Sequence, residues 1–238
     1  MARFLAFLPS SRLPAPCFPG LEAGQRPDRT AAAAPHAFGA DDTLHTLSLQ
    51  QWVNAKGGGI LLGASATKTN FEQLPLSQFS VIHLALHGYV DPEIPDRSAL
   101  VFAPQQQAMD DGLLQIGEIR NLHLNASLVT LSACNTGVGP VGEEGVANIV
   151  NAFIEAGSQS VVSTLWELED HATAHLMTVF YAHLGRHEEK AEALRQAKLE
   201  MLNSGAPPYY WAAFVLDGDP RSSLFRAPEG NLSSRSSR

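Results

Sequence analysis

Residues 127–137 read SLVTLSACNTG, in which a mostly apolar and β-branched run, 128–133, leads directly into Cys134. Such near-continuous apolar runs are typical of strands that are buried on both faces of a parallel sheet. Four further runs have the same character: GILLG (59–63), SVIHLAL (80–86), SVVSTLW (160–166) and AAFVLDG (212–218). The sequence therefore predicts five buried strands.

Segments with helical periodicity separate several of these strands. Apolar residues recur at helical spacing in three places: Val146, Ile149, Val150, Phe153 and Ile154; then Leu176, Phe180 and Leu184; then Leu194, Ala197 and Met201. Gly157 sits where a glycine would end the first of these helices. Because strands alternate with helices, we expect an α/β fold whose mostly parallel sheet is covered by helices on both faces.

Both ends of the chain differ in composition from the part between them. Residues 1–40 are rich in Pro, Ala, Arg and Gly and show no sustained periodicity, and residues 221–238 are similarly loop-like. We therefore expect an irregular N-terminal tail over 1–40, one folded domain over 41–220 and an irregular C-terminal tail over 221–238.

Composition excludes several classes of partner. The 238 residues carry a net charge of −8, so the chain lacks the basic surface that binds nucleic acids or anionic membranes. Its longest apolar runs are too short to cross a bilayer. Only two cysteines are present, Cys17 and Cys134, and they lie far apart, which argues against a disulfide framework and for a cytoplasmic, reducing compartment.

A thiol and an imidazole follow two of the predicted strands. The strand over 80–86 leads into His87 and Gly88, and the strand over 127–133 leads into Cys134. Ligand and catalytic sites of open α/β sheets form beyond the carboxyl ends of strands, so His87 and Cys134 are expected to meet and form a catalytic dyad. The backbone N–H groups of Gly88 and Cys134 would hold the oxyanion of a tetrahedral intermediate. His87 also precedes Cys134 by roughly the 50 residues that separate these groups in caspases.

Several motifs in one order resemble the CHAT domain, a family related to caspases and separases. They are HLALHG (83–88), LSACNTGVG (131–139), GEEGVANIVNAFIEAGSQSVVSTLWELEDHAT (142–173), FYAHL (180–184), ALRQAK (193–198) and PPYYWAAFVLDGD (207–219). The resemblance implies a caspase-like three-layer sandwich and a cysteine endopeptidase with His87 as base and Cys134 as nucleophile. No metal or organic cofactor is expected. The expected partners are a protein or peptide substrate and a regulatory repeat protein. The family usually begins with further strand and helix elements, which residues 1–40 do not clearly supply.

The segment LWELED (165–170) carries carboxylates next to the predicted site. Separases, which cleave after arginine, have a similar segment, so the resemblance suggests that Asp170 binds a basic side chain of the substrate. A carboxylate facing a guanidinium would be a strong bidentate selector. The alternative is that Asp170 caps the helix that follows.

Other patterns have weaker functional interpretations. Gly137, Gly139 and Gly142 form G-x-G-x-x-G, but Glu143 and Glu144 would repel the pyrophosphate of a dinucleotide, so we favour an active-site loop. His171 and His175 are spaced as in zinc proteases, and His183 and His187 repeat that spacing. The glutamate of H-E-x-x-H is missing, which indicates surface histidines.

Two apolar segments contain polar or aromatic residues that a packed core explains. His83, inside an apolar strand, is expected to be a packed core residue. Tyr209, Tyr210 and Trp211 would either line a substrate groove or pack in the core, and core packing is favoured. The functional alternative for the whole chain is a catalytically inactive scaffold that keeps the fold as a protein-interaction module.

Overall fold

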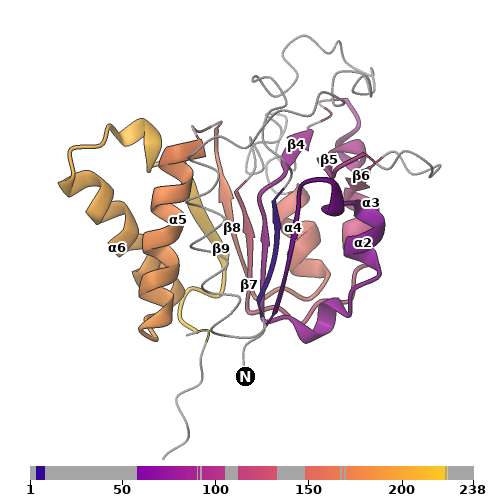
Figure 1. Cartoon of the computed structure of the whole chain (residues 1–238), viewed down its shortest axis with the longest axis horizontal. Helices are drawn as coiled ribbons and strands as arrows, with labels where there is room; N and C mark the ends of the chain where they lie inside the picture. The colour runs from indigo at the N-terminus through magenta and orange to yellow at the C-terminus, as the bar shows by residue number, and fades with distance from the viewer. Residues whose placement is uncertain are drawn as a thin grey trace, which may run out of the picture.

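A six-stranded sheet forms the centre of the protein (Figure 1). The computed structural model describes residues 4–8, 58–89, 91, 93–104, 112–132, 148–166, 168, 170–222 and 224. The strands are β1 (Phe4–Leu8), β2 (Gly58–Leu62), β3 (Val81–Leu84), β7 (Leu128–Leu131), β8 (Ser160–Thr164) and β9 (Phe214–Gly218), in the spatial order β2-β1-β3-β7-β8-β9. Only β9 runs antiparallel to its neighbour. All five predicted strands and the mostly parallel sheet are confirmed.

Strand β1 corrects the prediction of an irregular tail over residues 1–40. Phe4–Leu8 pair in parallel with β2 on one side and with β3 on the other. Leu5 and Ala6 are buried. The run FLAFL is as apolar as the predicted strands, but it is followed at once by the Pro- and Arg-rich stretch 9–40, with which the prediction grouped it.

Helices cover both faces of the sheet. They are α2 (Lys68–Glu72), α3 (Ile116–Arg120), α4 (Asn148–Glu155), α5 (Asp170–Gly185) and α6 (Lys190–Asn203). The first three pack with residues such as Ile82 and Val129 in one apolar core. Helices α5 and α6 pack with residues such as Val81 and Val162 on the opposite face. The three predicted helices are confirmed, and the result is a three-layer sandwich.

The end of α4 shows the glycine cap expected from the sequence. Gly157 has a φ of +110°, in the region that side chains disfavour. Its N–H donates to the carbonyl of Ile154, and the N–H of Ser158 donates to that of Phe153. These bonds satisfy carbonyls that the last turn of α4 would otherwise leave without partners.

A second, small sheet lies beside the carboxyl ends of the main strands (Figure 1). It consists of β4 (His87–Tyr89), β5 (Ala99–Val101) and β6 (Leu113–Gln115), all antiparallel. Leu100 and Leu114 from its inner face join the same core as α2, α3 and α4. This sheet was not predicted, because strands of three residues are too short to show a pattern. In the parts of the chain that the structure describes, no helix is long and apolar enough to span a membrane.

His183 links α5 to α6. Its Nδ1 lies 2.9 Å from Glu188 Oε1 and its Nε2 lies 3.0 Å from Glu200 Oε1. The prediction of surface histidines is wrong here, since His183 is only 7% exposed, whereas His171, His175 and His187 are exposed. Burial disfavours the imidazolium and so does Arg186, but the hydrogen bonds to both glutamates outweigh these effects and raise the pKa of His183.

Because the folded protein raises the pKa of His183, the stability that this group supplies should be complete below about pH 6.5 and lost as pH rises through the folded pKa. We expect His183→Gln to lower the free energy of unfolding by about 1 to 3 kcal/mol near pH 6 and by much less near pH 9. Urea unfolding from pH 5.5 to 9 would measure this. His171→Gln, at an exposed site on the same helix, is the control, and parallel pH profiles for all three proteins would contradict the expectation.

Candidate functional site

The carboxyl ends of β3, β7 and β8 lie side by side at one edge of the main sheet, beside β4 in Figure 1. Leu84 of β3 is level with Leu131 of β7. One residue later, the N–H of Ser132 donates to the carbonyl of Leu84 over 3.2 Å. The segments that follow these two strands therefore leave the sheet as neighbours, at the edge where α/β proteins place their sites.

His87 lies three residues beyond the end of β3, but it does not end that strand as the sequence suggested. Strand β3 stops at Leu84, and His87 is the half-buried first residue of β4, opposite Val101. The apolar run continues past Leu84 because Leu86 enters the core shared with α3 and α4. Gly88, the predicted oxyanion donor, is the buried middle residue of β4.

The other predicted site residues are described less fully. Cys134 lies outside the described residues, two positions after Ser132, and so do the three glycines of the G-x-G-x-x-G pattern. Asp170 is the first residue of α5, which follows β8. Strand β7, which precedes Cys134, and helix α5, which begins at Asp170, are therefore both placed in the fold. The dyad and the role of Asp170 stay predictions.

A chain of hydrogen bonds behind this edge was not predicted. His83 of β3 lies with Nε2 3.0 Å from Ser132 Oγ and with Nδ1 2.8 Å from the hydroxyl of Tyr181 on α5. The Tyr181 hydroxyl donates to Thr130 Oγ1 over 3.0 Å, and burial raises the pKa of Tyr181. His83 is buried, which confirms its prediction as a core residue. Sequence offers one signal: Thr130 and Ser132 alternate along an apolar strand and so share a face.

Aromatic side chains gather where β8 ends and β9 begins. The ring of Trp166 stacks on that of Tyr209 with centroids 6.1 Å apart, and its Nε1 donates to the Tyr209 carbonyl over 3.0 Å. Tyr210 and Trp211 pack against the core around α5 and α6, as predicted. Tyr209 differs from the prediction because its side chain is 56% exposed. An exposed aromatic surface therefore lies beside the candidate site.

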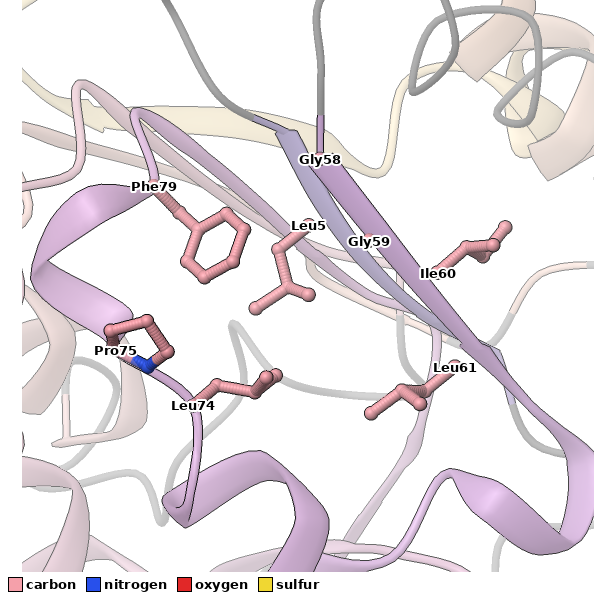
Figure 2. A pocket seen from close by; sticks show the side chains of 8 residues that line it. All are labelled: Leu5, Gly58, Gly59, Ile60, Leu61, Leu74, Pro75 and Phe79. Atoms are coloured by element: carbon pink, nitrogen blue, oxygen red, sulfur yellow. The ribbon is translucent and has the colours of Figure 1, made fainter.

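An apolar groove of about 290 Å³ lies elsewhere, along edge strand β2 (Figure 2). Its lining residues are Leu5, Gly58, Gly59, Ile60, Leu61, Leu74, Pro75 and Phe79. None of them was predicted as a site residue, and none carries a titratable group. Within the described part of the chain, no three His, Cys, Asp or Glu side chains are grouped as metal ligands would be.

Comparison with known sequences gives one family and two curated relatives. The profile of the CHAT domain matches residues 31–219. Tetratricopeptide repeat protein 28 of Mus musculus is 31% identical over 108 residues, which cover 44% of this chain and 4% of that protein. The Homo sapiens protein of the same name is 28% identical over 141 residues, covering 56% of this chain and 6% of that protein. The chain thus spans a small fraction of the length of these relatives.

Comparison with solved structures identifies proteins of similar fold. The separase of the Saccharomyces cerevisiae separase–securin complex superposes with a TM-score of 0.58 at 11% identity, over 93% of this chain and 12% of that one. The Arg-specific cysteine proteinase gingipain R superposes with a TM-score of 0.56 at 11% identity, over 93% of this chain and 46% of that one. At this level of identity the likeness shows a shared caspase-like fold.

Proposed function

Because this chain belongs to the CHAT domain family, we propose that it is a caspase-like cysteine endopeptidase in which His87 activates Cys134. The observation that carries this proposal is the pairing of β3 with β7 at the carboxyl edge of the sheet. The Ser132 N–H bond to Leu84 holds the two strand ends together immediately before the segments that contain His87 and Cys134. The similarity of the fold to separase and gingipain R supports it.

The proposed reaction needs only groups of this chain, a peptide and water. His87 takes the proton of the Cys134 thiol, and the thiolate attacks the peptide carbonyl carbon. The N–H groups of Gly88 and Cys134 donate to the resulting oxyanion. The protonated His87 gives its proton to the leaving amine as the C–N bond breaks, which leaves a thioester on Cys134. Water, deprotonated by His87, then hydrolyses the thioester and restores the thiol.

A peptidyl acyloxymethyl ketone, which alkylates the nucleophile of cysteine proteases, tests this proposal. We expect a single adduct on Cys134, located by mass spectrometry of the digested protein, and none on Cys17, the other cysteine of the chain. If the probe instead labels Cys134 and Cys17 in the same ratio as iodoacetamide does, the result would indicate ordinary thiol reactivity and contradict the proposal.

We further propose that Asp170, at the start of α5, selects a basic residue before the cut. Asp170→Asn removes the charge of this first helical residue of α5 while it keeps the size and shape of the side chain. We expect an arginine-ended probe to react faster than an aspartate-ended one, and this preference to fall at least about tenfold in Asp170→Asn. Glu189→Gln, an exposed change at the start of α6, is the control. An unchanged preference in Asp170→Asn would leave capping as the role of this residue.

The alternative is a catalytically inactive interaction module. The two curated relatives are named as tetratricopeptide repeat proteins and are far longer than this chain, which favours a regulatory repeat protein as partner in either case. An intact fold with an unmodified Cys134 after prolonged exposure to both probes would favour this second function.

A further inference from the structure

The hydrogen-bond chain Ser132–His83–Tyr181–Thr130, here called the buried relay, joins three elements around the candidate site. His83 comes from β3, Thr130 from β7 and Tyr181 from α5, and Ser132 follows directly after β7. His83, Thr130 and Tyr181 are buried, and Ser132 is partly buried. Each bond is 2.8 to 3.0 Å long. His87 follows β3, Cys134 follows β7, and Asp170 is the first residue of α5.

The donors in the relay follow one from another. The Tyr181 hydroxyl donates its proton to Thr130 Oγ1, so its oxygen accepts from Nδ1–H of His83. With the imidazole in its neutral form, Nε2 would then be the acceptor and the Ser132 hydroxyl the donor. Tyr181 and Ser132 together engage both ring nitrogens of His83.

Ser132 is consequently held by two bonds from the same strand. Its N–H donates to the Leu84 carbonyl of β3 over 3.2 Å, and its Oγ donates to His83, the neighbouring residue of β3, over 3.0 Å. Ser132 directly follows β7 and precedes Cys134 by two positions, and Leu84 ends β3 and precedes His87 by three. The two bonds therefore hold Ser132 next to the end of β3, from which the segment with His87 departs.

We propose that the buried relay positions the segment carrying Cys134 against His87, with Ser132, His83 and Tyr181 as positioning residues. This inference rests on the proposed function, because it assigns the relay to that dyad. Apolar side chains of similar volume would pack the same space, but they fix no hydroxyl direction. A satisfied polar network inside a low-dielectric core fixes one arrangement, and a catalytic pair requires such fixed geometry.

The reactivity of Cys134 with iodoacetamide as a function of pH tests the relay without requiring peptide cleavage. The full chain with Cys17→Ser serves as the parent, so that only Cys134 reacts. A thiol close to an imidazole forms its thiolate at lower pH than an isolated thiol. We expect Tyr181→Phe and Ser132→Ala to slow alkylation near pH 6 at least about tenfold, with rates converging near pH 10.

Two matched variants separate positioning from stability. Ser132→Thr keeps the hydroxyl and should retain the parent profile. Phe180→Leu removes a ring whose centroid lies 5.4 Å from that of Tyr181 but changes none of the hydrogen-bonding groups of the relay, so it should lower stability while it leaves the pH profile unchanged. Circular dichroism confirms that each variant is folded under the conditions of alkylation.

The outcomes distinguish this inference from the proposed function. Profiles of Tyr181→Phe and Ser132→Ala that superimpose on the parent's overturn the relay, even if the peptide probe labels Cys134. If the pH profiles of these two variants shift but no peptide probe labels the parent protein, the result supports the relay and counts against the peptidase. A parent Cys134 that alkylates like an ordinary exposed thiol overturns both.

Discussion

Alanine in place of His87 should slow the acylation of Cys134 by an arginine-ended peptide substrate by about 10²- to 10⁴-fold, the contribution typical of a positioned general base. The imidazole removes the thiol proton before attack and returns it to the leaving amine, and alanine provides neither step. Single-turnover kinetics, in which the enzyme exceeds the substrate, would measure acylation separately from hydrolysis of the thioester.

The matched control for this change is His171→Ala, at an exposed position in the first turn of α5. It should leave the rate within about twofold of the parent, since surface substitutions of this kind have small effects. A His87→Ala protein that is folded and acylates at the parent's rate would remove His87 from the mechanism and leave Cys134 without its proposed base.

A large effect on stability is expected for Gly157→Ala, with a loss of about 3 kcal/mol in the free energy of unfolding. The added Cβ would overlap the carbonyl oxygen of Leu124, and the residue would keep a φ of +110°. The backbone of Leu124 cannot withdraw easily, because its N–H donates to the carbonyl of Ala156 over 2.9 Å. Chemical denaturation at neutral pH would measure the loss.

Two other glycines distinguish the cost of a positive φ from the cost of the overlap with Leu124. Gly205 has a φ of +81° but open space around its Cβ position, so Gly205→Ala should cost about 1 kcal/mol from backbone strain alone. Gly117, inside α3, has no positive φ and no atom within 4 Å of the Cβ position, so Gly117→Ala should stabilise by about 0.5 to 1 kcal/mol. Similar losses for Gly157→Ala and Gly205→Ala would show that the overlap with Leu124 relaxes.

The sequence predicts the central sheet well because burial on both faces leaves a direct trace. The runs 80–86 and 160–166 consist mainly of apolar and β-branched residues, and they form β3 and β8. Strand β1 buries Leu5 and Ala6 and is as long as β8, but it directly precedes the Pro- and Arg-rich stretch 9–40, so it was grouped with that stretch. The small sheet of β4, β5 and β6 depends on pairing between distant short segments, which a pattern along the chain does not record.

The candidate site was likewise predicted only in part. The carboxyl ends of β3 and β7 were expected to meet, and the structure places them side by side. The position of His87 in β4 was missed, because Leu86 enters the core and extends the apolar run beyond the strand. The bonds of His83 could not be foreseen, since its partners lie 49 and 98 residues away in sequence.

The place of β1 between β2 and β3 has a consequence for how the chain folds during synthesis. Phe4 pairs with Gly58 and with Val81, so β1 finds no partner in the main sheet until more than fifty further residues have left the ribosome. At about 5 to 20 residues per second, that interval lasts several seconds. During this interval β1 waits for non-local pairings with β2 and β3, which are the kind of contact that slows folding.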